Sequence, residues 1–229
     1  MGMLTDNLNE VRARVAAACL RSGRDPREVT LIAVSKTKPV PMLEEVYAQG
    51  VRDFGENRPQ EMRDKAAELP ADIRWHMIGR LQTNKVKYVV PRAVLIHSVD
   101  SLHLAEAIDK EAAKAGVTAN ILIEVNIAGE ASKGGIAPEE TEGFARELAA
   151  LPNLKVNGLM TIAPIVENGE ENRAYFRQMR ELLVDIRDKN IDNIFMRSLS
   201  MGMTGDFETA IEEGATLVRV GTGIFGGRS

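Results

Sequence analysis

The sequence predicts an α/β fold, namely a single (β/α)8 barrel of the TIM type with one extra helix at the N-terminus. Eight short apolar runs alternate with helix-like stretches that are long enough to cross between parallel strands. The length of 229 residues suits one such barrel. No Pro/Gly/Ser-rich linker or short repeat interrupts the pattern, so residues 1–229 are expected to form one domain.

The elements are expected in the following order. Residues 4–21 form an amphipathic helix, because Leu4, Leu8, Val11 and Val15 recur at spacings of three and four. A strand buried on both faces follows, since Val29–Val34 is apolar and rich in β-branched residues. The remaining strand-like runs are Val51–Phe54, Arg74–Ile78, Val94–Val99, Ile121–Asn126, Val156–Ile162, Phe195–Leu199 and Leu217–Val220. Helix-like stretches between them cover 41–49, 58–68, 82–89, 101–115, 138–150, 170–189 and 204–213.

The outer ring of helices is expected to lack its eighth member. Only nine residues follow Val220, which is too few for a full eighth helix. The N-terminal helix is therefore expected to cover that gap.

Composition excludes several classes of function. No segment approaches the roughly 18 consecutive apolar residues of a membrane span, and Met1–Arg21 lacks the pattern of a secretory signal, so a cytoplasmic protein is expected. The net charge of −4 argues against a broad nucleic-acid-binding face. One cysteine and three dispersed histidines show no metal-ligand spacing, so no metal site is expected.

In such barrels the active site lies at the carboxyl ends of the strands, which directs attention to polar residues just past each apolar run. Lys36 follows the first run. A lysine emerging from a buried strand lies beside low-dielectric surroundings that favour its neutral amine, the form that attacks an aldehyde. The alternative is an ordinary strand-end lysine that reaches solvent.

Two glycine-rich segments follow the last two strands, where barrels often bind phosphate through backbone N–H groups. They are Ser200–Gly205 and Gly221–Gly223, although glycines in either could simply make tight turns. Because the first and eighth strands are neighbours in a closed barrel, Lys36 and Arg219 should face the same mouth. Gly221–Gly226 matches the dinucleotide-binding G-x-G-x-x-G pattern, but the chain ends three residues later, which rules out the required βαβ unit.

Motifs along nearly the whole chain resemble those of the pyridoxal phosphate homeostasis protein family, whose barrel is similar to the N-terminal domain of bacterial alanine racemase. The matching segments are Ala33–Pro39, Phe54–Asn57, Trp75–Gly79, His97–Asp100, Gly158–Met160, Leu199–Met203 and Val218–Gly221. One departure is Thr204, where the family usually has serine, but a hydroxyl remains there.

The resemblance implies a site for pyridoxal 5'-phosphate (PLP) with no metal. Lys36 would hold the cofactor as a Schiff base, and Arg219 would face the pyridine nitrogen. Ser200 and the backbone around Gly202, Met203, Gly221, Thr222 and Gly223 would bind the phosphate. Asn57, His76 and Met160 would line the ring pocket. From the residues alone, a packed or hydrogen-bonded His76 is favoured over a general base, and Met160 could simply fill core space.

No catalytic residue is assigned, because the chain lacks the racemase's separate C-terminal domain with its tyrosine. The three tyrosines, Tyr47, Tyr88 and Tyr175, lie in helix-like stretches. An always-charged Arg219 at the ring nitrogen would also make the cofactor a weak electron sink, although the racemases are similar in this respect.

Three functions remain open at this stage. The favoured one is a monomeric carrier or buffer that takes part in PLP (vitamin B6) homeostasis and supplies apo PLP-dependent enzymes. The second is a PLP-dependent enzyme such as a small amino-acid racemase. The third is a barrel that binds another phosphorylated metabolite without covalent chemistry.

Overall fold

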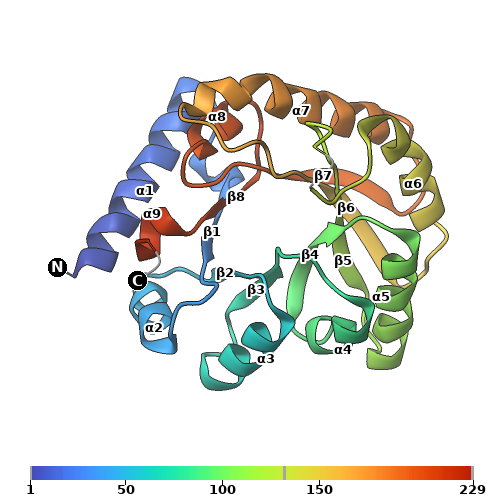
Figure 1. The fold of residues 1–229 in the computed structure, drawn as a ribbon, viewed down its shortest axis with the longest axis horizontal. Coiled ribbons are helices and arrows are strands. Elements are labelled where there is room, and N and C mark those ends of the chain that lie inside the picture. Colours follow the sequence, from blue (N-terminus) through green and yellow to red (C-terminus); the bar gives the residue numbers. More distant parts are fainter. Residues whose placement is uncertain (1, 131–132, 228–229) are drawn as a thin grey trace.

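The computed structural model describes residues 2–130 and 133–227, which form a closed barrel of parallel strands surrounded by helices (Figure 1). The strands follow one another around the barrel in chain order, and the first pairs with the last through Thr30 to Leu217 and Ala33 to Val220. The strands are β1 (Thr30–Val34), β2 (Asp53–Glu56), β3 (Arg74–Met77), β4 (Ala93–Val99), β5 (Ala119–Glu124), β6 (Leu154–Met160), β7 (Ile194–Ser200) and β8 (Leu217–Val220). The predicted barrel is confirmed.

Helices occupy the connections and form the outer ring. They are α1 (Met3–Arg21), α2 (Val40–Ala48), α3 (Pro59–Glu68), α4 (Val86–Val89), α5 (Leu102–Ala115), α6 (Thr141–Leu148), α7 (Arg173–Asp188), α8 (Phe207–Glu212) and α9 (Thr222–Phe225). After β8 the described residues, which end at Gly227, form only the four-residue α9, and α1 packs against α2, α8 and α9 (Figure 1). The N-terminal helix therefore fills the gap in the ring, as predicted.

Three strands are shifted from their predicted bounds by two residues. The run predicted at 51–54 becomes β2 at Asp53–Glu56, which extends past Phe54 because Gly55 and Glu56 pair with β3. The apolar runs placed the other two at 121–126 and 156–162, whereas β5 and β6 begin with the paired residues Ala119 and Leu154. Pairing between backbones extends the strands through polar Asn120 and Lys155, which an apolar run does not mark.

Some predicted helices are shorter in the structure. The stretch 204–213 becomes α8 from Phe207, because the Asp206 carboxylate accepts the Met203 N–H at 2.7 Å and holds a turn before the helix. The stretch 82–89 divides into a 3-10 turn at Thr83–Lys85 and the short α4.

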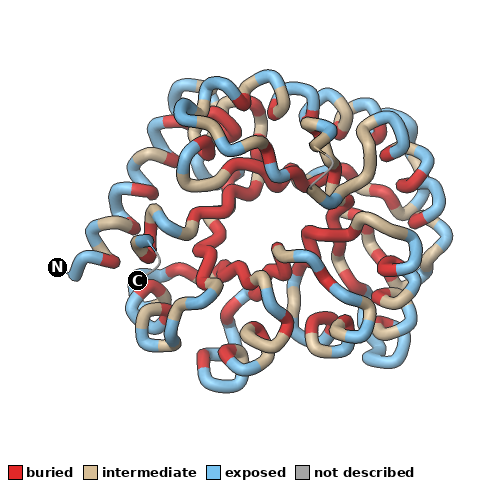
Figure 2. Tube along the Cα trace, viewed as in Figure 1, coloured by how far each residue is buried: buried red, intermediate tan, exposed pale blue. Residues whose placement is uncertain are grey.

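Buried residues lie along the barrel strands and on the parts of the helices that face them (Figure 2). The buried hydrophobic residues form two clusters, a large one and a small inner layer. The inner layer consists of Ile32, Leu95, Leu122, Met160 and Leu217. Close strand packing requires Gly158, since a Cβ there would lie 1.8 Å from the Ser198 carbonyl oxygen. Among the helices in residues 2–130 and 133–227, none combines the length and apolar character that a membrane span needs.

Candidate functional site

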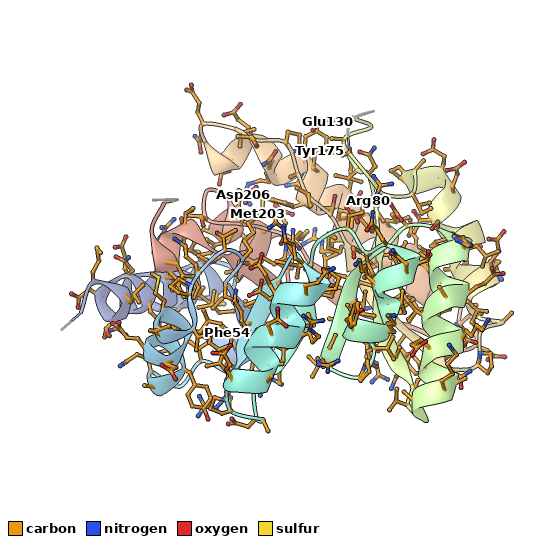
Figure 3. The ribbon with its side chains drawn as sticks, turned by 60° about the horizontal axis from the view of Figure 1, so that its bottom comes forward. Phe54, Arg80, Glu130, Tyr175, Met203 and Asp206 are labelled. Carbon is orange, nitrogen blue, oxygen red and sulfur yellow. The ribbon has the colours of Figure 1, made fainter. Side chains whose placement is uncertain are left out.

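A cavity of about 320 Å³ opens at the carboxyl ends of β1 and β8, and this volume falls within the range of ligand pockets. Its lining residues are Val34, Lys36, Asn57, Ile78, Ile162, Met203, Thr204, Gly205, Arg219, Gly221 and Thr222. In Figure 3, Met203, Asp206 and Arg80 lie towards the upper side of the ribbon, and Phe54 lies nearer the opposite side. Lys36 and Arg219 share this cavity, as barrel closure predicted.

Lys36 is the lysine of this region whose amine remains available. It is half-buried, and it makes no hydrogen bond or ion pair with any residue that the structure describes. The Lys38 amine, by contrast, donates to the carbonyls of Phe225, Gly226 and Gly227. The Lys65 amine donates to Ser35 and Glu56. A free amine facing a cavity can act as a nucleophile towards a bound aldehyde.

The turn that carries Lys36 is fixed from behind by a buried polar cluster. The Ser35 hydroxyl donates to Glu56 Oε1 at 2.6 Å, and the Lys65 amine donates to the same oxygen at 2.7 Å and to the Ser35 carbonyl at 2.8 Å. Thr37 has a left-handed backbone, with φ of 63°, and its N–H donates to Glu61 at 2.8 Å. Burial raises the pKa of Glu56 despite its contact with Lys65. The cluster therefore holds the residues on both sides of Lys36.

Arg219 is a buried cation on the other wall. Its Nη1 donates to the Ser200 hydroxyl at 2.5 Å and its Nη2 to the Thr161 carbonyl at 2.8 Å. No carboxylate of the described residues lies within ion-pair distance, and burial lowers its pKa to about 10, which still leaves the guanidinium charged at neutral pH. A guanidinium has five N–H donors, so Arg219 retains donors for a ligand.

Two threonines face each other at the third side of the cavity. Thr204 follows β7 and Thr222 follows β8, and their hydroxyl oxygens are 3.1 Å apart. The Gly223 N–H donates to the Thr204 hydroxyl at 3.3 Å. Gly202 needs its left-handed φ of 90° and its missing Cβ, which would lie 2.6 Å from the Ala210 Cβ. The glycines therefore shape the two loops that present these hydroxyls.

The structure brings together six of the eleven residues that the resemblance assigned. Those lining the cavity are Lys36, Asn57, Met203, Arg219, Gly221 and Thr222. Gly202 and Gly223 belong to its two supporting loops. Ser200, His76 and Met160 are buried inside the barrel below the cavity, where Met160 joins the apolar inner layer.

A second cavity of about 310 Å³ adjoins the first, and they share Asn57, Ile78 and Ile162. It also contains Glu124 and Asp100. Burial and the charge of Asp100 raise the pKa of Glu124 to about 7. Sequence reasoning did not identify Glu124, although it ends the apolar part of a predicted strand, where the other site residues were sought.

Comparison with known proteins gives a consistent picture. The family model for the N-terminal domain of alanine racemase matches residues 5–229. The pyridoxal phosphate homeostasis protein of Aquifex aeolicus (strain VF5) is 47% identical over 224 residues, covering 97% of each chain. The protein of that name from Escherichia coli (strain K12) is 38% identical over 232 residues, covering 100% of this chain and 98% of the relative.

The chain belongs to the pyridoxal phosphate homeostasis protein family. Among solved structures, PipY of Synechococcus elongatus PCC7942 with PLP bound is 38% identical, with a TM-score of 0.81, over 94% of this chain and 100% of that one. An alanine racemase of Clostridium difficile 630 has a TM-score of 0.73 at 15% identity, over 98% of this chain and 56% of that one, so the likeness concerns the fold. The predicted family is thus confirmed.

Proposed function

We propose that this member of the pyridoxal phosphate homeostasis protein family binds PLP in the cavity at the barrel mouth, holds it as a Schiff base on Lys36, and acts as a reversible carrier or buffer that supplies PLP-dependent enzymes. PLP supplies an aldehyde that condenses reversibly with primary amines. The observation that carries the proposal is the uncommitted Lys36 amine in one cavity with the unpaired, buried Arg219. The relatives' names and the PLP-bound PipY neighbour support it.

The donor set fits the three polar parts of this cofactor. Lys36 offers the amine, and Arg219 offers N–H donors to a ring nitrogen. The Thr204 and Thr222 hydroxyls, with the adjacent Gly205 backbone, suit a phosphate. A buried guanidinium without a carboxylate partner is costly, and a negatively charged ligand in the cavity offsets this cost.

Borohydride reduction of the PLP-incubated protein, followed by peptide mass mapping, tests the attachment. We expect one pyridoxyl adduct, on the peptide that contains Lys36. Lys36→Ala should abolish the adduct, whereas Lys38→Ala, which removes the neighbouring committed amine, should retain it. An unmodified Lys36 in the wild-type protein, or an adduct that survives in Lys36→Ala, would refute the attachment.

The carrier role is tested separately from binding. The PLP-loaded protein should not exchange the α-proton of common amino acids in deuterated water, and it should restore activity to an apo PLP-dependent enzyme. Rapid exchange with any amino acid would favour the enzyme alternative. A loaded protein that fails to restore the apo-enzyme at all would contradict the carrier role while leaving the Lys36 attachment intact.

A further inference from the structure

A continuous chain of hydrogen bonds crosses the barrel interior from its amino-terminal end to the cofactor cavity. The Arg74 guanidinium donates to the Asp53 carboxylate, which lies 3.0 Å from His76 Nε2. His76 Nδ1 lies 3.0 Å from His97 Nε2, and His97 Nδ1 lies 2.9 Å from the Ser200 hydroxyl. Ser200 accepts from Arg219 at 2.5 Å.

The positions of these residues in their strands explain how the row of hydrogen bonds runs from one end of the barrel towards the other. Asp53 begins β2, His76 is the third residue of β3 and His97 is the fifth residue of β4. Ser200 ends β7, on the other side of the barrel, and Arg219 lies in β8. Exposure falls along the route, because the Arg74 side chain is 55% exposed whereas His97 and Ser200 are completely buried.

The direction of the chain follows from which groups can donate. A carboxylate only accepts and a guanidinium only donates, so the two ends of the chain are fixed. Burial, with the charges of His76 and Arg219, lowers the pKa of His97 well below its usual value, so this ring is neutral. Hydrogen bonds from His76 and Arg74 lower the pKa of Asp53 although burial opposes them, which keeps this carboxylate charged.

If each ring carries a single proton, one arrangement satisfies every contact. His76 carries its proton on Nε2 and donates to Asp53, so its Nδ1 accepts from His97 Nε2. His97 Nδ1 then accepts the Ser200 hydroxyl proton, which leaves the Ser200 oxygen to accept from Arg219. All hydrogen bonds therefore point from the cavity towards Asp53, and hydrogen bonds in such a row strengthen one another.

We infer that Asp53 is a remote positioning residue, which acts through His76, His97 and Ser200 to fix the guanidinium of Arg219 at the cofactor cavity. Its acceptor oxygen selects the tautomer of both histidines and thereby the direction of the Ser200 hydroxyl. Ser200 and the Thr161 carbonyl then hold two nitrogens of Arg219, which sets the plane of its remaining donors. The effect on PLP binding rests on the proposed function. The row of hydrogen bonds from Asp53 through His76, His97 and Ser200 to Arg219, here called the relay, is a property of the ligand-free protein.

Nitrogen NMR of the histidine rings in ligand-free protein tests the relay directly. The sequence has three histidines, and the third, His103, is exposed on α5 and serves as an internal reference. We expect His76 and His97 each to carry one proton, on Nε2, at neutral pH. A His76 with both nitrogens protonated, or a His97 protonated on Nδ1, would mean that the chain runs in the opposite direction and would overturn the inference.

Variants at the two ends of the relay, Asp53 and Ser200, test whether a change at one end alters the ring protonation of both histidines. In Asp53→Ala the ring signals of both His76 and His97 should change, and in Asp53→Asn, which keeps an acceptor oxygen, they should stay close to wild type. Asp72→Ala is the matched control, because Asp72 also binds an arginine, Arg52, but lies outside the relay. If Asp53→Ala does not fold, Ser200→Ala removes the other end and should change both rings. If the ring nitrogen signals of His97 are unchanged in both Asp53→Ala and Ser200→Ala, the relay is refuted.

Binding of PLP gives the functional readout. We expect the dissociation constant to rise about 5- to 10-fold in Asp53→Ala, the worth of one hydrogen bond, and to stay unchanged in Asp72→Ala. Unchanged PLP affinity in a folded Asp53→Ala would show that Asp53 does not position Arg219. If the wild-type protein bound no PLP, the proposed function would fail, while the ring nitrogen signals would still decide the relay.

Discussion

Replacing Glu124 by glutamine should stabilise the protein at alkaline pH and leave its stability at acidic pH almost unchanged. Burial of this carboxyl, together with the nearby charge of Asp100, raises its pKa from 4.5 to about 7. The folded protein therefore holds this proton more tightly than the unfolded chain does. The carboxyl contributes its full stability below pH 4.5 and loses it as the pH rises through 7.

The magnitude follows from the two pKa values. The interval from 4.5 to about 7 corresponds to about 3 kcal/mol, at about 1.4 kcal/mol for each pH unit. Glu124 is only half-buried, so water reduces this figure, and we expect about 2 kcal/mol. Glutamine has nearly the same shape and cannot ionise, so Glu124→Gln should gain that amount above pH 8 relative to wild type.

Urea unfolding of both proteins between pH 4 and pH 9 measures the difference in the free energy of unfolding. Glu181→Gln, an exposed position on α7, serves as the control and should give a difference that is small and independent of pH. A Glu124→Gln protein whose advantage is constant across this range, or grows as the pH falls, would refute the argument from burial and Asp100.

Four further substitutions test the packing and the cavity. Lys65→Met leaves the buried carboxyl of Glu56 without its cation and should cost about 3 kcal/mol in urea unfolding, unlike substitution of an exposed lysine. Gly158→Ala drives a Cβ into β7 and should lower the free energy of unfolding by about 3 kcal/mol; an unchanged midpoint would contradict this. Thr204→Val and Thr222→Val, which keep the side-chain shape, should each weaken PLP binding about tenfold in an absorbance titration.

The sequence predicted the barrel because periodicity reports burial directly. Apolar β-branched runs at regular spacing predicted all eight strands, and the stripe beginning at Leu4 predicted the helix that fills the outer ring. Barrel closure then placed Lys36 and Arg219 in one mouth without any structural information, since the first and last strands of a closed barrel must be neighbours. The ends of β5 and β6 were missed because backbone pairing, rather than side-chain hydrophobicity, sets them.

Only the tertiary structure decided which polar groups meet. His76 and His97 are 21 residues apart, and Ser200 lies a further 103 residues along the chain, so no spacing rule connects them. The Lys38 amine likewise binds the Phe225 carbonyl, 187 residues away, and the Lys65 amine binds the Ser35 carbonyl, 30 residues away. Because these two amines are hydrogen-bonded, Lys36 is left as the available amine. Apolar patterns are local and survive in a linear sequence, whereas hydrogen bonds depend on atoms that only the closed barrel brings within 3 Å.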